Sequence, residues 1–166
     1  MELDPEIRKE FCQESYGLIS DLSTVLEELE EDLDNRKLLE EFGQKIDRMM
    51  GAAKSLELEE MGVICELGKV IGYKSCQIEG DVDLISVVVA ILFDTLDILT
   101  EMVKDLEKEV KKEAGTLHLE KFVSRLRWLA EKFKHVTKAS CDVEEVSTEE
   151  LGEIDKDLED LIDELG

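Results

Sequence analysis

The stretch of sequence that decides the fold is residues 84–93, which read LISVVVAILF. A helix formed by this stretch would be apolar around almost its whole circumference, which is typical of a helix enclosed by other helices. The stretch is too short to cross a membrane, because a spanning helix needs about 18 apolar residues. We therefore expect a long helix over residues 81–112, with its first half inside a bundle and its charged second half amphipathic.

Three more helices are expected before residue 81. Asp4 and Pro5 mark the start of the first, because an aspartate side chain caps free backbone N–H groups and proline fits the first helical position. Apolar residues then recur at helical spacing in three successive stretches, over residues 5–33, 36–55 and 58–71. Gly72 and Gly80 are expected to bracket the loop that leads to residue 81.

Two helices are expected after the long one. Gly115 breaks the chain, and residues 116–138 then combine an apolar stripe with an excess of Lys and Arg over Glu. A linker over residues 139–146 leads to Ser147 and Glu150, which form a capping box at the start of a last, acidic helix. This acidic helix could fold back on the basic helix or act as a detachable peptide.

The expected fold is therefore all-α, an antiparallel four-helix bundle with two further C-terminal helices. We divide the chain into three parts. Residues 1–114 form the bundle, and residues 115–138 form a basic amphipathic helix that packs on the bundle or extends it. Residues 139–166 form the linker and the acidic amphipathic C-terminal helix.

The composition excludes several classes of function. The 166 residues include 43 Asp and Glu against 20 Lys and Arg, which gives a formal net charge of −23. Such an acidic surface repels nucleic-acid phosphates and anionic lipids, so we expect neither nucleic acid nor membrane as a partner. The sequence contains no metal-ligand spacing, phosphate-binding glycine loop or common hydrolase motif, so we expect no metal and no cofactor.

The cysteines and the first residues indicate a cytoplasmic location. Cys12, Cys65, Cys76 and Cys141 form no CxxC pair, so we expect four thiols in a reducing compartment. The opening MELDPE lacks the basic and then apolar profile of a signal peptide.

Two stretches of the expected bundle resemble those of a known signalling family. Residues 11–15 read FCQES and precede a leucine stripe that ends in LEELEED, and residues 46–53 read IDRMMGAA. Further apolar residues follow at Leu56, Met61, Ile64 and Cys65. This order resembles histidine phosphotransfer domains, and is nearest to the N-terminal phosphotransfer domain of chemotaxis histidine kinases. The resemblance covers about residues 5–112 and implies a helical bundle of two-component signalling.

The position of the phospho-accepting residue departs from that family. Asp47 stands where the family has its histidine, and Met50 stands where it has a lysine. A reversible relay needs a nitrogen nucleophile, because its phosphoramidate is a high-energy donor. The resemblance therefore implies a pseudo-phosphotransfer module, which binds response-regulator receiver domains, or another signalling protein, without phosphotransfer. The implied contact residues are Gln44, Asp47, Arg48, Gly51, Ala52 and Lys54.

A phosphatase is the alternative that the same helix suggests. Glu40 and Gln44 resemble the Asp-x-x-x-Gln pair of CheZ-type receiver phosphatases, and Asp47 lies close behind them. In this alternative Glu40, Gln44 or Asp47 positions the water that attacks a receiver's aspartyl phosphate. The C-terminal sequence DLEDLIDELG also resembles the acidic tail peptide of that family. The same spacing is common on solvated helix faces.

Three further alternatives remain open from the sequence. His135 begins the stretch HVTKAS, which is locally similar to the family's His-x-x-Lys-Gly-Ser pattern, so it is an alternative phospho-acceptor. Gly51 and the alanines after it could serve only the close packing of helices. The chain could also be a structural bundle that self-associates through its apolar stripes, with a homodimer as one form.

Overall fold

The computed structural model describes residues 3–109, 119–133 and 160–164. Within these ranges the chain forms five helices and a short helical segment at residues 160–164, and it contains no β-strand. The helices are α1 (Pro5–Glu31), α2 (Lys37–Ser55), α3 (Glu59–Ser75), α4 (Val82–Glu107) and α5 (Leu119–Phe133). The predicted all-α class is therefore confirmed.

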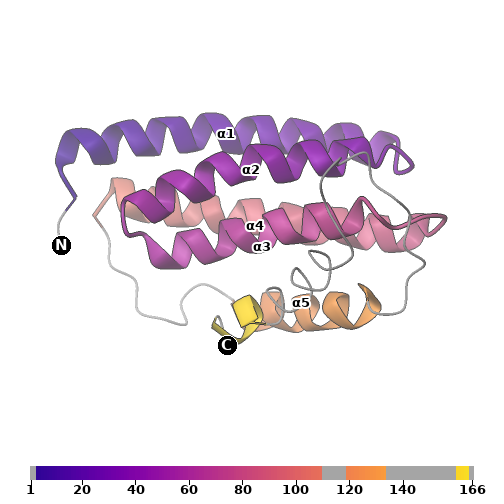
Figure 1. Ribbon diagram of the computed structural model, residues 1–166. Coiled ribbons are helices and arrows are strands. Elements are labelled where there is room, and N and C mark those ends of the chain that lie inside the picture. The colour runs from indigo at the N-terminus through magenta and orange to yellow at the C-terminus, as the bar shows by residue number, and fades with distance from the viewer. Residues whose placement is uncertain (1–2, 110–118, 134–159, 165–166) are drawn as a thin grey trace.

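The first four helices form a bundle (Figure 1). α1 packs against α2 and α4, while α3 packs against the same two helices from the other side. Successive helices run in opposite directions along the bundle, as Figure 1 shows. α5 lies across the outside of the bundle and packs on α4.

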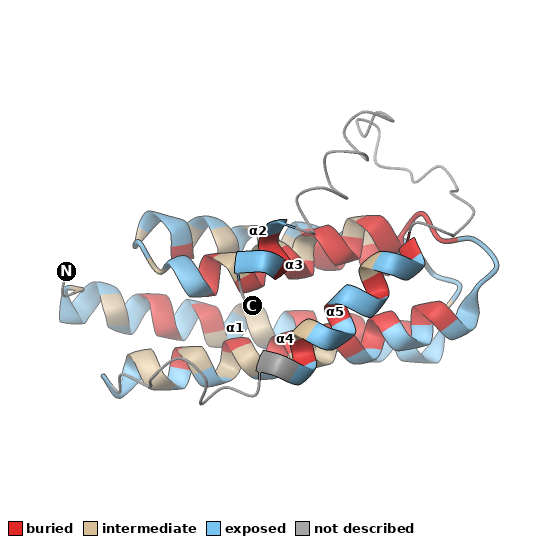
Figure 2. Cartoon of the chain, turned by 90° about the horizontal axis from the view of Figure 1, so that it is seen from below, coloured by how far each residue is buried: buried red, intermediate tan, exposed pale blue. Residues whose placement is uncertain are grey.

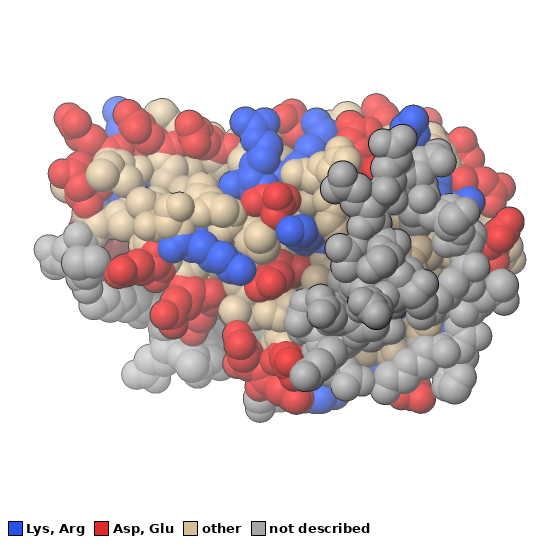
Figure 3. All heavy atoms as spheres, in the orientation of Figure 1, with Lys and Arg blue, Asp and Glu red and all other residues tan. Residues whose placement is uncertain are grey.

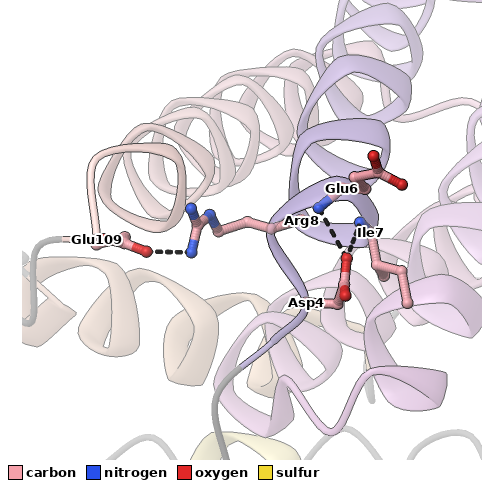
Figure 4. Close-up of polar contacts among 5 residues, drawn as sticks. All are labelled: Asp4, Glu6, Ile7, Arg8 and Glu109. Carbon is pink, nitrogen blue, oxygen red and sulfur yellow. Dashed lines mark hydrogen bonds and ion pairs between the residues drawn. The ribbon is translucent and has the colours of Figure 1, made fainter.

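The start of α1 follows from its sequence (Figure 4). Oδ1 of Asp4 accepts hydrogen bonds from the backbone N–H groups of Glu6, at 2.9 Å, and Ile7, at 3.4 Å. These two N–H groups have no acceptor within the helix, and the Asp4 side chain supplies one. Arg8 then forms an ion pair with Glu109, which joins the start of α1 to the residues just after α4.

The core lies along the bundle axis. The predicted stripe of α2 is completely buried, at Leu39, Phe42, Ile46, Met49 and Ala53. Most of the apolar stretch 84–93 of α4 is buried as well, but Val87 is 38% exposed and Ala90 is exposed (Figure 2). The expectation that other helices enclose this stretch on all sides is therefore too strong, because α1, α3 and α5 leave one side of α4 open.

The C-terminal boundary of α3 differs from the prediction. Gly72 does not begin the loop, since α3 continues to Ser75. A Cβ atom built on Gly72 would lie 2.9 Å from the backbone oxygen of Leu39 in α2. This glycine therefore allows close helix packing and does not mark a turn. Gly80 does lie in the loop, where its φ of +76° suits a residue without a side chain.

The basic helix and the acidic tail are only partly described. α5 buries Phe122, Leu126, Leu129 and Phe133. In the acidic C-terminal part, residues 160–164 are helical, and Leu161 and Ile162 are buried. His135, the linker and the predicted capping box at Ser147 lie outside the described residues.

The cysteines differ in part from the expectation of four thiols. Cys12 and Cys65 are free and buried, and burial raises the pKa of the Cys65 thiol to about 12, so it stays protonated. Cys76 is disulfide-bonded, so the prediction is wrong for that residue, and Cys141 lies outside the described residues. The cysteines therefore no longer support a reducing compartment.

Among the helices that the structure describes, none combines the length and the apolar character that crossing a bilayer would require.

Candidate functional site

The candidate site is the outer side of α2, opposite its buried stripe. We call it the α2 face and define it by Glu40, Gln44, Asp47, Arg48 and Gly51. Glu40, Gln44, Asp47 and Gly51 follow one another at steps of three or four, and Arg48 lies one turn after Gln44, so helical geometry places all five on one side of α2. Gln44, Arg48 and Gly51 are exposed, and Glu40 and Asp47 are half-buried. The structure thus brings together most of the residues that the sequence selected.

Asp47 is held by a lysine of the neighbouring helix. Its Oδ1 lies 2.8 Å from Nζ of Lys69 in α3, and the two side chains are 46% and 30% exposed. Asp47 is thus a partly exposed carboxylate in an ion pair. Sequence analysis missed Lys69, because nothing in the sequence pairs a position late in α3 with the middle of α2.

A second ion pair joins the same two helices and involves Lys54. Its Nζ lies 3.1 Å from Oε2 of Glu66, and a Cβ built on Gly62 would lie 3.3 Å from Cγ of Lys54. Lys54 therefore lies along the seam between α2 and α3, at the margin of the α2 face. Both pairs are exposed enough that each contributes only about 0.2–1 kcal/mol to stability.

Tyr73 completes the polar border of the α2 face. Its ring packs over Gly43, where a built Cβ would lie 3.0 Å from Cε1 of the ring. Burial raises the pKa of the Tyr73 hydroxyl, and the negative charges of Asp47 and Glu40 raise it further. Tyr73 therefore remains a neutral phenol beside two carboxylates. Sequence analysis missed this residue too, because its contacts come from packing between α2 and α3.

Gly51 and the two alanines after it have different environments. Ala53 is completely buried and Ala52 packs partly against the core. In contrast, a Cβ built on Gly51 would meet no atom of the described residues within 4 Å. The hypothesis that these small residues serve close helix packing therefore holds for Ala53 and in part for Ala52, but Gly51 has no such role among the residues that the structure describes.

The charges around the site are mixed. Figure 3 shows Lys and Arg side chains over α2 and α3, with acidic side chains among and around them. Arg48 is exposed on the α2 face, and Lys54 and Lys69 add basic groups along the seam. The site thus offers charged hydrogen-bond donors, from Lys and Arg, and neutral ones, from the Gln44 amide and the Tyr73 hydroxyl, although the protein as a whole is strongly acidic.

The described residues also limit the chemistry of the site. They contain no group of three His, Cys, Asp or Glu side chains that could hold a metal ion. His135, the alternative phospho-acceptor, lies outside them. Glu40, Gln44 and Asp47, the alternative phosphatase residues, share the α2 face, although Lys69 engages Asp47.

Comparison of the chain with protein-family models, with curated proteins and with solved structures finds no significant match.

Proposed function

We propose that this protein is a two-component signalling module that binds response-regulator receiver domains through the α2 face and transfers no phosphoryl group. The observation that carries the proposal is Gly51, an exposed helical glycine with open space above it. Glycine in the middle of a helix costs about 0.5–1 kcal/mol relative to alanine. Packing among the described residues does not require it, and we attribute it to a partner that approaches the helix backbone closely.

The surroundings of Gly51 suit a protein partner. Arg48 lies about one turn before Gly51 and Gln44 about two turns before it, on the same face of α2. Both side chains are exposed. Arginine is enriched at protein interfaces, and amide groups supply directed hydrogen bonds. Around the circumference of α2, Ala52 lies on one side of Gly51 and Lys54 on the other. Both would lie at the margin of the contact. A stable interface of about 800 Å² on each partner would extend from the face onto neighbouring helices.

The absence of phosphotransfer follows in this proposal from the residue at position 47. Asp47 is a carboxylate paired with Lys69, where a relay would need an imidazole nitrogen. Cytoplasmic location is part of the proposal. Self-association as a homodimer stays compatible with it, provided that the α2 face remains accessible.

The phosphatase alternative has one observation in its favour. Glu40 and Gln44 lie one turn apart on the α2 face, and the Gln44 side chain is exposed. An exposed amide can orient a water molecule in line with a receiver's aspartyl phosphate. In this alternative Gln44 acts on the water directly, with Glu40 or Asp47 beside it.

One experiment separates these functions. Receiver domains from the same organism, carrying a radiolabelled aspartyl phosphate, are mixed with the protein, and binding, loss of label and transfer of label are followed. We expect at least one receiver to bind, with no label on this protein and no faster loss. Gain of label would overturn the proposal and direct attention to His135.

Two other outcomes are release of free phosphate and failure of every receiver to bind. Faster release of free phosphate would favour the phosphatase, provided that Gln44→Ala abolishes it and Gln13→Ala, a change at an exposed amide of α1, does not. If no receiver binds, the proposed function is wrong.

A further inference from the structure

α5 is a basic element on an acidic protein. Within Leu119–Phe133 there are four Lys and Arg residues and two Glu residues, although the whole chain carries a net charge of −23. The helix buries its apolar side and leaves Arg125, Arg127 and Lys132 exposed. Trp128 is 44% exposed between these cations, and Nζ of Lys132 lies 5.5 Å from the centre of its ring.

The end of the acidic tail is seated next to this helix. Figure 1 shows the C-terminal segment beside α5. Leu161 and Ile162 are 6% and 1% exposed and belong to the apolar core of the molecule, which also includes the inner side of α5. Oδ1 of Asp163 lies 3.1 Å from Nη2 of Arg127. The contact thus combines two adjacent apolar side chains with one carboxylate on a cation.

The ion pair in this contact is weak, whereas the two apolar side chains are buried. The Arg127 and Asp163 side chains are 54% and 68% exposed, so water and salt screen their attraction. The attachment therefore rests mainly on Leu161 and Ile162. Another helix with the same arrangement of groups would make the same contacts.

We propose that the surface under residues 160–164, with Arg127 at its edge, is a docking site for an acidic amphipathic helix of a partner protein. We call this surface the α5 site. The partner helix carries two adjacent large apolar residues followed by a carboxylate, as Leu161, Ile162 and Asp163 do. The chain's own segment occupies the α5 site until the partner displaces it. This inference is independent of receiver binding by the α2 face.

The net charge of the whole chain disfavours polyanions as occupants of the α5 site. A nucleic acid or an anionic lipid surface is repelled by the net charge of −23, because it presents many negative charges at once. A short acidic helix brings few charges and places one of them on Arg127. Its apolar pair replaces Leu161 and Ile162, so the exchange leaves no apolar surface uncovered.

Tryptophan fluorescence gives a direct test in the full chain, because Trp128 is the only tryptophan and lies next to Arg127. The probe is a peptide with the sequence DLEDLIDELG, and its control has both central apolar residues replaced by Asp. The full-length variant Leu161→Ala/Ile162→Ala weakens the chain's own segment. We expect this variant to bind the probe about tenfold or more tightly than the wild type. The control peptide should not bind.

A matched pair of arginine variants tests the role of the charge. Added to the double variant, Arg127→Glu should weaken probe binding about tenfold or more, because it removes the cation at the site and repels the peptide. Arg125→Glu should change it by no more than about twofold, since Arg125 forms its ion pair with Asp94 of α4. Asp163→Asn, an exposed change that leaves the apolar pair in place, should also raise probe affinity above that of the wild type.

Several results would overturn the inference. One is a double variant that keeps its circular dichroism spectrum yet binds no probe. Another is equal binding by the wild type and the double variant, because the chain's own segment would then not occupy the α5 site. A third is a wild type that is dimeric by light scattering and becomes monomeric in the double variant, which would make a second copy's tail the natural occupant.

Discussion

Gly72→Ala is expected to lower the free energy of unfolding by about 1–3 kcal/mol, although alanine favours a helix interior by about 1 kcal/mol over glycine. The new Cβ would lie 2.9 Å from the backbone oxygen of Leu39 and 3.4 Å from the backbone nitrogen of Gly43. Backbone atoms cannot rotate away as a side chain can, so α2 and α3 would have to separate. Urea unfolding followed by circular dichroism measures the change.

Gly51→Ala is the matched control for this prediction. It makes the same chemical change in a helix interior, but the new Cβ meets nothing within 4 Å. It should therefore raise the free energy of unfolding by about 0.5–1 kcal/mol, through helix preference alone. If Gly72→Ala were as stabilising as Gly51→Ala, the close packing of α2 on α3 described above would be wrong.

Gly51→Trp is expected to weaken receiver binding by at least about thirtyfold, which corresponds to about 2 kcal/mol at a central interface position. The indole would occupy the space that the proposed partner needs above the α2 face. The fold should be unaffected, because no residue of the described part of the chain lies within 4 Å of a Cβ at this position. Isothermal titration calorimetry measures the affinity, and circular dichroism checks the fold.

Two controls make the Gly51→Trp result specific. Gly51→Ala adds only a methyl group and should bind far more tightly than Gly51→Trp. Ala90→Trp places the same indole on an exposed position of α4, outside the α2 face, and should leave binding unchanged. An intact Gly51→Trp protein with the wild-type affinity would rule out docking above Gly51.

The elements of this fold could be predicted because their signals are local. Asp4 and Pro5 identify the start of α1, and the spacing from Leu39 to Ala53 identifies the inner side of α2. Helix starts and apolar stripes depend on residues within one or two turns of each other. The same information selected the α2 face, because the outer side of a helix follows once its inner side is known.

The contacts between helices could not be predicted in the same way. Gly72 resembles a helix terminator in the sequence, and only the position of Leu39 in another helix shows that it serves packing. Lys69 and Tyr73 belong to the site because of how α3 is aligned along α2. That alignment cannot be predicted from the pattern of a single sequence. The open side of α4 likewise depends on where α5 packs.

Nuclear magnetic resonance can locate the surface on which a receiver domain docks. Isotope-labelled protein is titrated with the receiver that binds it, and the backbone amide shifts are followed residue by residue. Docking on the α2 face should give the largest shifts at Gln44, Asp47, Arg48 and Gly51, with smaller shifts at Lys54 and Lys69 along the seam. Shifts confined to α1, α4 or α5, with those of α2 unchanged, would contradict it.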